Sequence, residues 1–181
     1  MKRLLTAVLS LGFLLSLTVV AEGQHRHSPQ RRGYIGVGGG LGVPSGQFGT
    51  NAQLGWMSQG FAGYTTRGGL LGGRIDASFG NNPLGSPGSV WMGGATANAV
   101  LTPGPRPADF HPYFLVGVGG YYVNPTTGGG AIRLALNGGA GVQYHLGRQT
   151  DVYVEGRFLS IRTTSALNLI PITMGFRWGG I

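Results

Sequence analysis

Five charged residues interrupt otherwise apolar segments, and their types and spacing could support ion pairing. Arg74 and Asp76 form one pair two positions apart. Glu155 and Arg157 form a second pair, and Arg177 lies in a third segment. Residues two apart in a β-strand point to the same face, so each pair would project from one face of its strand. Because buried charges must be paired, we predict that these three arginines and two carboxylates form a structural cluster with a net charge of +1.

Catalysis would need a different cluster, in which a base lies within hydrogen-bond reach of a nucleophile. The chain has four histidines: His25, His27, His111 and His145. The first two belong to a polar stretch near the N-terminus, and the third belongs to a proline-rich stretch. Ser160 and Glu155 have opposite parity in one segment, so they would point to opposite faces of a strand. We therefore predict no catalytic residues and no enzymatic activity.

Metal and cofactor sites are not predicted either. His25 and His27 offer two ligands, fewer than a structural or catalytic zinc site uses. The chain has no cysteine, which excludes a thiolate ligand, a thiol nucleophile and a disulfide framework. The glycine-rich stretch 36–46 is not followed by Lys-Ser/Thr and opens no helix, so it does not match a phosphate-binding loop.

The charged pairs lie in two-faced segments that the sequence predicts as strands. In Leu169–Trp178 one parity is wholly apolar and Arg177 has the other; the apolar row is Ile170, Ile172, Met174, Phe176 and Trp178. Similar alternation, bounded by turn residues, recurs along the chain. The eight predicted strands are Gly33–Val43, Gln53–Thr65, Leu70–Phe79, Val90–Leu101, Tyr113–Val123, Ile132–Leu146, Asp151–Ile161 and Leu169–Trp178. The stretch 102–112 carries four prolines and is predicted to be a non-strand connection.

The N-terminus has the pattern of a secretory signal. Lys2 and Arg3 precede an apolar run, and Ala21 fits the last position before a cleavage site. The run is shorter than a membrane-spanning helix and is broken by small and polar residues. We predict a signal peptide at 1–21, a flexible periplasmic lead-in at 22–32 and one β-barrel domain at 33–181.

Composition narrows the class of protein further. Lys and Arg total 13 and Asp and Glu total 5, but the arginines are scattered along the chain, which argues against nucleic-acid binding. Glycine reaches 37 of 181 residues, and much of it lies inside the alternating segments. In a narrow closed barrel, such glycines leave room for larger inward side chains from neighbouring strands. An apolar face with aromatic residues near the strand ends is typical of a transmembrane barrel, whereas a soluble periplasmic β-barrel or sandwich would show the same parity.

The last three predicted strands carry a family resemblance. Asn137–Val142 (NGGAGV), Val154–Phe158 (VEGRF) and Ile170–Trp178 (IPITMGFRW) resemble the OmpA/OmpX-type β-barrel domain of small bacterial outer-membrane proteins. The opening GYIGVGGGLGVP and the RIDASF segment fit it too. The resemblance implies an eight-stranded antiparallel up-and-down barrel, a lumen filled by side chains, and insertion by the barrel assembly machinery. It also implies a terminal aromatic assembly signal, here Phe176 and Trp178, although three residues follow Trp178.

Together these features predict an integral protein of the bacterial outer membrane with a structural role in the envelope. Paired charged side chains would plug its lumen, and outer-membrane lipid would surround it as a monomer. The alternatives are a narrow ion or small-solute channel and, less favoured, a lipid-modifying enzyme of the outer membrane. The predicted surface loops, where a partner would bind, are Pro44–Ala52, Gly80–Ser89, Asn124–Gly130 and Arg162–Asn168. The sequence names no partner and does not establish which connections face the exterior.

Overall fold

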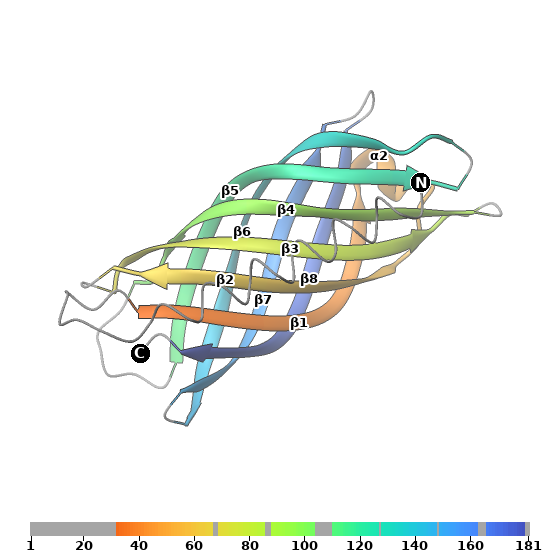
Figure 1. The fold of residues 1–181 in the computed structure, drawn as a ribbon. Helices are drawn as coiled ribbons and strands as arrows, with labels where there is room; N and C mark the ends of the chain where they lie inside the picture. Colours follow the sequence, from red (N-terminus) through yellow and green to blue (C-terminus); the bar gives the residue numbers. More distant parts are fainter. Residues whose placement is uncertain are drawn as a thin grey trace, which may run out of the picture. The chain divides into compact units, whose positions relative to one another are not determined.

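Eight antiparallel strands close into one barrel in the computed structural model (Figure 1). The structure describes residues 32–66, 69–85, 88–103, 110–126, 128–147, 149–162 and 166–179. Each strand pairs with its neighbours in the chain, and β8 closes the barrel by pairing with β1. The strands are β1 (Arg32–Ser45), β2 (Gly55–Thr65), β3 (Leu71–Pro83), β4 (Ser89–Leu101), β5 (Phe110–Pro125), β6 (Ala131–Gly147), β7 (Thr150–Ile161) and β8 (Leu167–Gly179).

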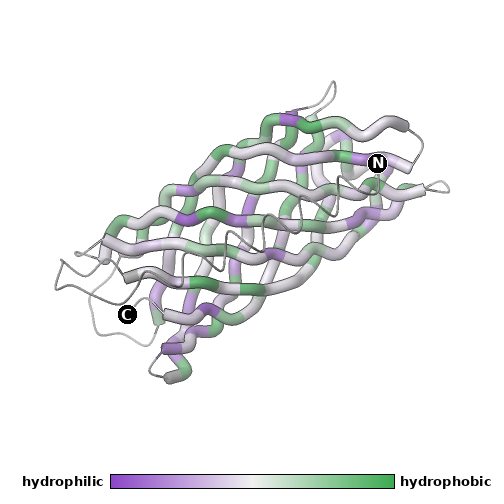
Figure 2. The backbone as a smooth tube through the Cα atoms, viewed as in Figure 1, coloured by the Kyte–Doolittle hydropathy of each residue, from purple (hydrophilic) through white to green (hydrophobic). Residues whose placement is uncertain are grey.

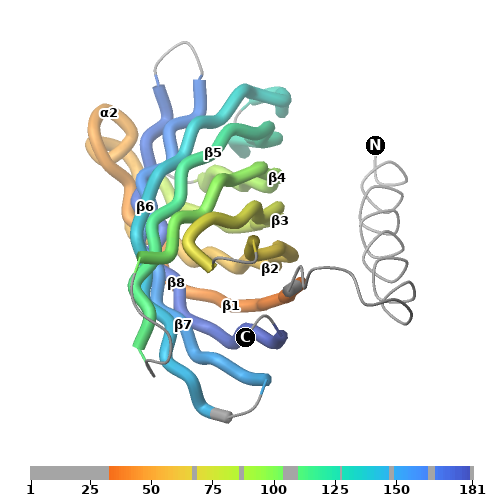
Figure 3. The backbone as a smooth tube through the Cα atoms, turned by 90° about the vertical axis from the view of Figure 1, so that its left-hand side faces the viewer, coloured from red at the N-terminus to blue at the C-terminus, as the bar shows by residue number. Residues whose placement is uncertain are grey.

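A single short helix, α2 (Gly46–Gly49), follows β1. Strands β1, β3, β5 and β7 all end on the side of the barrel that carries α2, which we call the helix end. Arg32 and Gly179 lie at the opposite side, which we call the terminal end. Seen from another direction, the strands follow one another round the barrel in chain order (Figure 3). No helix in the described ranges is long and apolar enough to cross a membrane.

The predicted alternation of faces is confirmed. Hydrophobic and hydrophilic residues alternate along the strands (Figure 2). Outward residues such as Val116 expose 64% of their surface, although they are apolar, whereas inward Asp76 and Glu155 expose 2% and 0%. Met57 and Phe61 of β2 are apolar but point inward, and both are buried inside the barrel. The protein thus turns an apolar surface outward and a partly charged one inward, as a barrel in lipid requires.

Strands β3 and β5 run further into proline-containing stretches than predicted. The prediction that 102–112 is a non-strand connection was wrong at its end, because β5 begins at Phe110 and contains Pro112. The pairing of β4 with β5 stops at Phe114, so Pro112 lies where that side of the strand has no ladder partner. Pro83 ends β3 beyond the last residue paired with β2, Asn81. Proline lacks the ladder donor and is tolerated at such free edges.

The predicted connections change accordingly. Parts of all four predicted surface loops belong to strands, since β1 ends at Ser45, β3 at Pro83 and β5 at Pro125. The fourth is shortened from its other side by the early start of β8 at Leu167. The predicted signal peptide and most of the lead-in lie outside the described residues, and β1 begins at Arg32, the last residue of that lead-in.

Inward glycines face large inward side chains on the neighbouring strand. Gly141 pairs in register with Tyr113, and Gly139 pairs with Arg157. A Cβ atom added at Gly141 would lie 2.5 Å from the Tyr113 ring, whereas one added at outward Gly156 would meet nothing within 4 Å. The same arrangement joins Gly63 to Tyr34, Gly36 to Phe61, and Gly94 to Tyr121. The glycines therefore make the lumen wide enough for the tyrosines and arginines that fill it.

Candidate functional site: the charged interior of the barrel

Four charged residues form a closed ring of ion pairs inside the barrel, which we call the quartet. It consists of Arg74 and Asp76 on β3 and Glu155 and Arg157 on β7. Arg74 Nη2 lies 2.6 Å from Glu155 Oε2, and Arg74 Nε lies 3.1 Å from Asp76 Oδ1. Arg157 completes the ring at 2.5 Å from both Asp76 Oδ1 and Glu155 Oε1. Each arginine therefore contacts both carboxylates, and the four charges cancel.

The strands that carry the quartet stand opposite each other. Between β3 and β7 lie β4, β5 and β6 on one side and β8, β1 and β2 on the other. The ion pairs therefore cross the lumen. All four side chains are almost fully buried, with residue exposures of 5% for Arg74, 2% for Asp76, 0% for Glu155 and 8% for Arg157. An isolated charge at this depth would be strongly destabilising, which the alternating ring avoids.

Neutral side chains complete the hydrogen bonding of the two carboxylates. The Tyr113 hydroxyl donates to Glu155 Oε2 at 2.8 Å, and Gln59 Nε2 lies 3.4 Å from Glu155 Oε1. Asn98 Nδ2 donates to Asp76 Oδ2 at 2.5 Å. Sequence reasoning missed these contributors, because a lone tyrosine, glutamine or asparagine on an alternating strand does not reveal which charge it will meet across the lumen.

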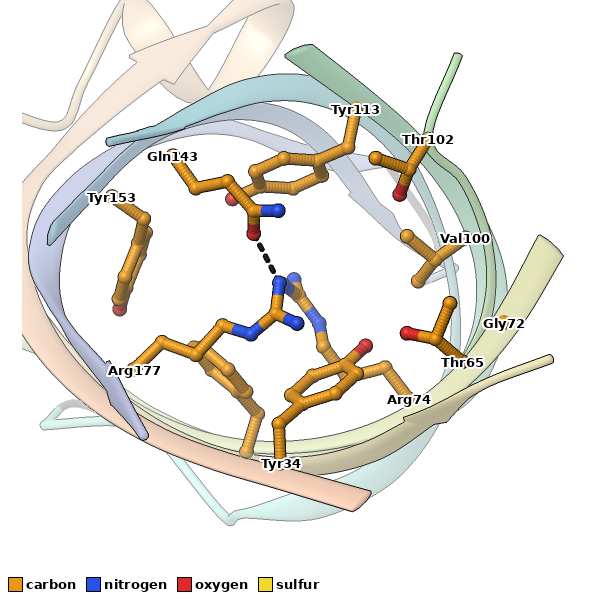
Figure 4. A pocket seen from close by; sticks show the side chains of 11 residues that line it. Tyr34, Thr65, Gly72, Arg74, Val100, Thr102, Tyr113, Gln143, Tyr153 and Arg177 are labelled. Atoms are coloured by element: carbon orange, nitrogen blue, oxygen red, sulfur yellow. Dashed lines mark hydrogen bonds between the residues drawn. The ribbon is translucent and has the colours of Figure 1, made fainter. Parts of the chain in front are cut away.

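Arg177 does not join the quartet, contrary to the predicted five-residue cluster. Its guanidinium lies 4.0 Å from the centre of the Tyr34 ring and donates a hydrogen bond to Gln143 Oε1 (Figure 4). Its nearest carboxylate is Asp151, with 3.7 Å between Arg177 Nε and Asp151 Oδ2. Asp151 also lies 2.7 Å from His145 Nδ1.

The sequence analysis overlooked Asp151 as an inward residue. Asp151 lies four positions before Glu155 and therefore shares its parity, so the alternation could have identified it. With Asp151 included, the interior holds three arginines and three carboxylates. The predicted net charge of +1 was therefore wrong, and these six groups balance.

The helix end of the lumen is filled by apolar side chains, which we call the apolar plug. Its members are Met57, Val90, Met92, Tyr121, Val123, Ala135, Leu159, Ile161, Leu167 and Leu169, all 9% exposed or less. Phe48 of α2 and Leu84 pack against it from outside. At the terminal end, a cavity of about 10 Å³ is lined by polar groups that include Arg74 and Arg177 (Figure 4). The lumen is thus closed twice, once by charge pairing and once by apolar packing.

The two aromatic residues of the predicted assembly signal lie on the outer face of β8. Phe176 and Trp178 are 48% and 39% exposed, and their rings stack with centroids 6.2 Å apart. A second outward aromatic cluster, formed by Trp56, Phe79 and Trp91, lies toward the helix end. Such outward aromatics are typical of the interfacial girdles of membrane barrels.

The described residues hold little that could support catalysis or metal binding. No group of three or more His, Cys, Asp or Glu residues in the described ranges could hold a metal ion. His145 and Asp151 form a pair, but within that part of the chain no serine hydroxyl hydrogen-bonds to either. His25 and His27 lie outside the described residues.

Comparison with known proteins identifies the class to which this barrel belongs. The Outer membrane protein beta-barrel domain family matches residues 11–176. The chain belongs to this family, and the protein is an integral β-barrel of the bacterial outer membrane. Its lumen is plugged by paired charged side chains together with the apolar plug. No curated protein sequence matches the chain.

Several solved structures share the fold. Neisserial surface protein A superposes with a TM-score of 0.69 at 15% identity, covering 82% of this chain and 99% of the other. The N-terminal β-barrel domain of OprF from Pseudomonas aeruginosa gives 0.54 at 15% identity, covering 83% and 98%. Ail, the attachment invasion locus protein of Yersinia pestis, gives 0.53 at 13% identity, covering 82% and 99%. At these identities the similarity establishes the fold alone.

Proposed function

We propose that the protein is a closed structural element of the outer membrane that conducts no ions. The observation that supports this proposal best is the double closure of the lumen. A hydrated ion entering from the terminal end would have to break the quartet and then cross the apolar plug. The one polar side-chain group among the members of the plug is the Tyr121 hydroxyl, which is hydrogen-bonded to Ser78. An eight-stranded barrel has an interior only wide enough for its own side chains, so no passage runs beside them.

Planar-bilayer recording tests this proposal. We expect purified, folded protein to give a flat current trace. A mobility shift that appears only on boiling in SDS would show that the same preparation contains the folded barrel. The channel alternative predicts discrete conductance steps that Arg157→Ala alters, and such steps would overturn the structural proposal.

We further propose that the chain has no enzymatic activity. The support is the separation of its candidate groups: Glu155 is enclosed by two arginines, and among the described residues His145 has Asp151 as a partner but no serine or threonine hydroxyl bonded to it. Folded protein incubated with phospholipid and lipid A should leave both unchanged in mass. Release of a fatty acid that depends on His145 would contradict this.

The orientation in the membrane is also a proposal. We propose that the helix end faces the exterior and the terminal end faces the periplasm, with Phe176 and Trp178 as the signal for the barrel assembly machinery. Because the chain has no cysteine, the labelling of a single introduced cysteine shows on which side of the membrane that residue lies. Gln47→Cys at the helix end should react with an impermeant maleimide on intact cells, and Gln149→Cys at the terminal end should not. The reverse pattern would invert the orientation.

A further inference from the structure

Asn137 is a buried residue whose carboxamide has no protein partner. Its side chain points into the barrel from β6, and the residue is only 5% exposed. Neither its Oδ1 nor its Nδ2 has a hydrogen-bond partner among the described residues. Leaving a buried polar group unpaired costs about 1–3 kcal/mol, and a carboxamide has both donors and an acceptor to satisfy.

A small cavity with both polar and apolar lining residues lies against this carboxamide. Its volume is about 10 Å³, and it lies between the quartet and the apolar plug. Arg157 lines it from the quartet, and Leu159 lines it from the plug. Gln59, Ser78, Thr96 and Tyr121 add polar groups to its wall, and Met57 and Pro171 add apolar ones. The cavity has room for about one water molecule, the size at which a polar site can hold one.

The register of the strands places a second buried asparagine near Asn137. Asn98 on β4 pairs with Gly117 on β5, and Gly117 pairs with Asn137 on β6. The inward position between the two asparagines is a glycine, and the Asn98 carboxamide lies over it. Asn98 Oδ1 is likewise buried without a partner among the described residues. Two carboxamides with unused hydrogen-bonding capacity thus flank a glycine.

We propose that Asn137 binds a structural water molecule in this cavity. The residues that line the cavity determine which ligand can bind there. A cation would be repelled by the Arg157 guanidinium, and a polyatomic anion exceeds the space available. Water can accept from Asn137 Nδ2, donate to Asn137 Oδ1 and reach the hydroxyls of Ser78 or Tyr121, which gives it the two to four polar partners that buried waters have. The site does not depend on whether the barrel conducts.

Cross-relaxation between water and asparagine side chains tests the proposal in the full-length, folded protein in lipid nanodiscs. The probe is bulk water, detected by NMR at the side-chain NH₂ groups of nitrogen-15-labelled protein. We expect a cross-peak at Asn137 with the sign of a long-lived internal water. Asn82 is the internal control, because it is 1% exposed but its Nδ2 donates to the carbonyls of Gly42 and Gln53 at 2.8 and 3.0 Å. Its NH₂ group should show no such peak.

The Asn137 signals are identified by their loss in Asn137→Asp or, if that variant does not fold, by triple-resonance assignment of the wild-type protein. An Asn137 NH₂ group as isolated from water as that of Asn82 would overturn the proposal. So would a hydrogen bond from Asn137 to a protein carbonyl.

Discussion

Glu155 is the residue on which most of the interior contacts converge. It contacts both arginines of the quartet and the Tyr113 hydroxyl, and it is completely buried. Glu155→Gln keeps the shape of the side chain but leaves two buried arginines facing one carboxylate. Breaking a buried ion pair in this way costs about 3–5 kcal/mol, so we expect a loss of that size in the free energy of unfolding, measured by urea titration in lipid vesicles.

Asp151→Asn is the matched control for this substitution. Asp151 is also buried, but its nearest arginine nitrogen is 3.7 Å away and it lies near the terminal end. We expect it to lose clearly less stability than Glu155→Gln. Equal losses would mean that the ring arrangement of the quartet adds nothing beyond the burial of a single carboxylate.

The sequence predicted part of the charged site correctly. Parity placed Arg74, Asp76, Glu155 and Arg157 on inward faces, because alternation has a period of two whatever the register. It did not separate Arg177 from them. The height of a side chain along the lumen depends on strand tilt and stagger, which pairing across the barrel establishes and a single segment does not.

Between neighbouring strands, an inward glycine leaves room for the large inward side chain opposite it. Gly141→Ala would place a methyl group against the Tyr113 ring, and Tyr113 also hydrogen-bonds Glu155. Overpacking of this kind costs about 1–3 kcal/mol, which urea unfolding should detect. Gly156→Ala on the outer face meets nothing and should be neutral or slightly stabilising. If the two substitutions have the same effect, the inward glycines do not serve to make room.

The outer face of the strands gives a second prediction. Val118 lies near the middle of β5 and is 55% exposed, whereas Ile132 lies at the start of β6 and is 77% exposed. An arginine facing lipid costs about 2–4 kcal/mol at the bilayer midplane and about 0–1 kcal/mol near its surface. Val118→Arg should therefore destabilise the barrel in vesicles far more than Ile132→Arg. The opposite order would place the membrane at a different height on the barrel.

Strand ends were the least predictable part of the elements. Apolar alternation located all eight strands, but proline and asparagine were interpreted as turn residues at Gly80–Pro83 and Phe110–Pro112. Gly80 and Asn81 are paired on both sides, whereas Asn82, Pro83 and Phe110–Pro112 lie where the pairing with one neighbouring strand has already ended, so one side of the ladder needs no donor there. This freedom comes from the staggered ends of a tilted barrel. The sequence of one strand does not indicate where the neighbouring strands end.

For the whole molecule, the apolar plug matters more to closure than the sequence suggested. Alternation assigns each residue to a face of its own strand. It did not show that inward residues from β2, β4, β5, β6, β7 and β8 converge at the helix end. That convergence puts an apolar barrier behind the charged one. The quartet is therefore not the only closure of the lumen.

The two closures can be separated by substitution. Glu155→Ala with Arg157→Ala removes one acid and one base and leaves Arg74 paired with Asp76 at 3.1 Å, so no charge is left unpaired. We expect this double variant to remain non-conducting in planar bilayers, because Met92 and Leu159 still exclude hydrated ions. Met92→Ser with Leu159→Ser, in which the quartet is intact, should remain closed as well.

Only the four substitutions together should give conductance steps, since only they weaken both the charged barrier and the apolar one. Each variant must first show the mobility shift of a folded barrel on boiling. Conductance from the quartet variant alone would show that the apolar plug is no barrier to ions. The quartet would then be the one closure of a channel, and the structural role proposed for this protein would be wrong.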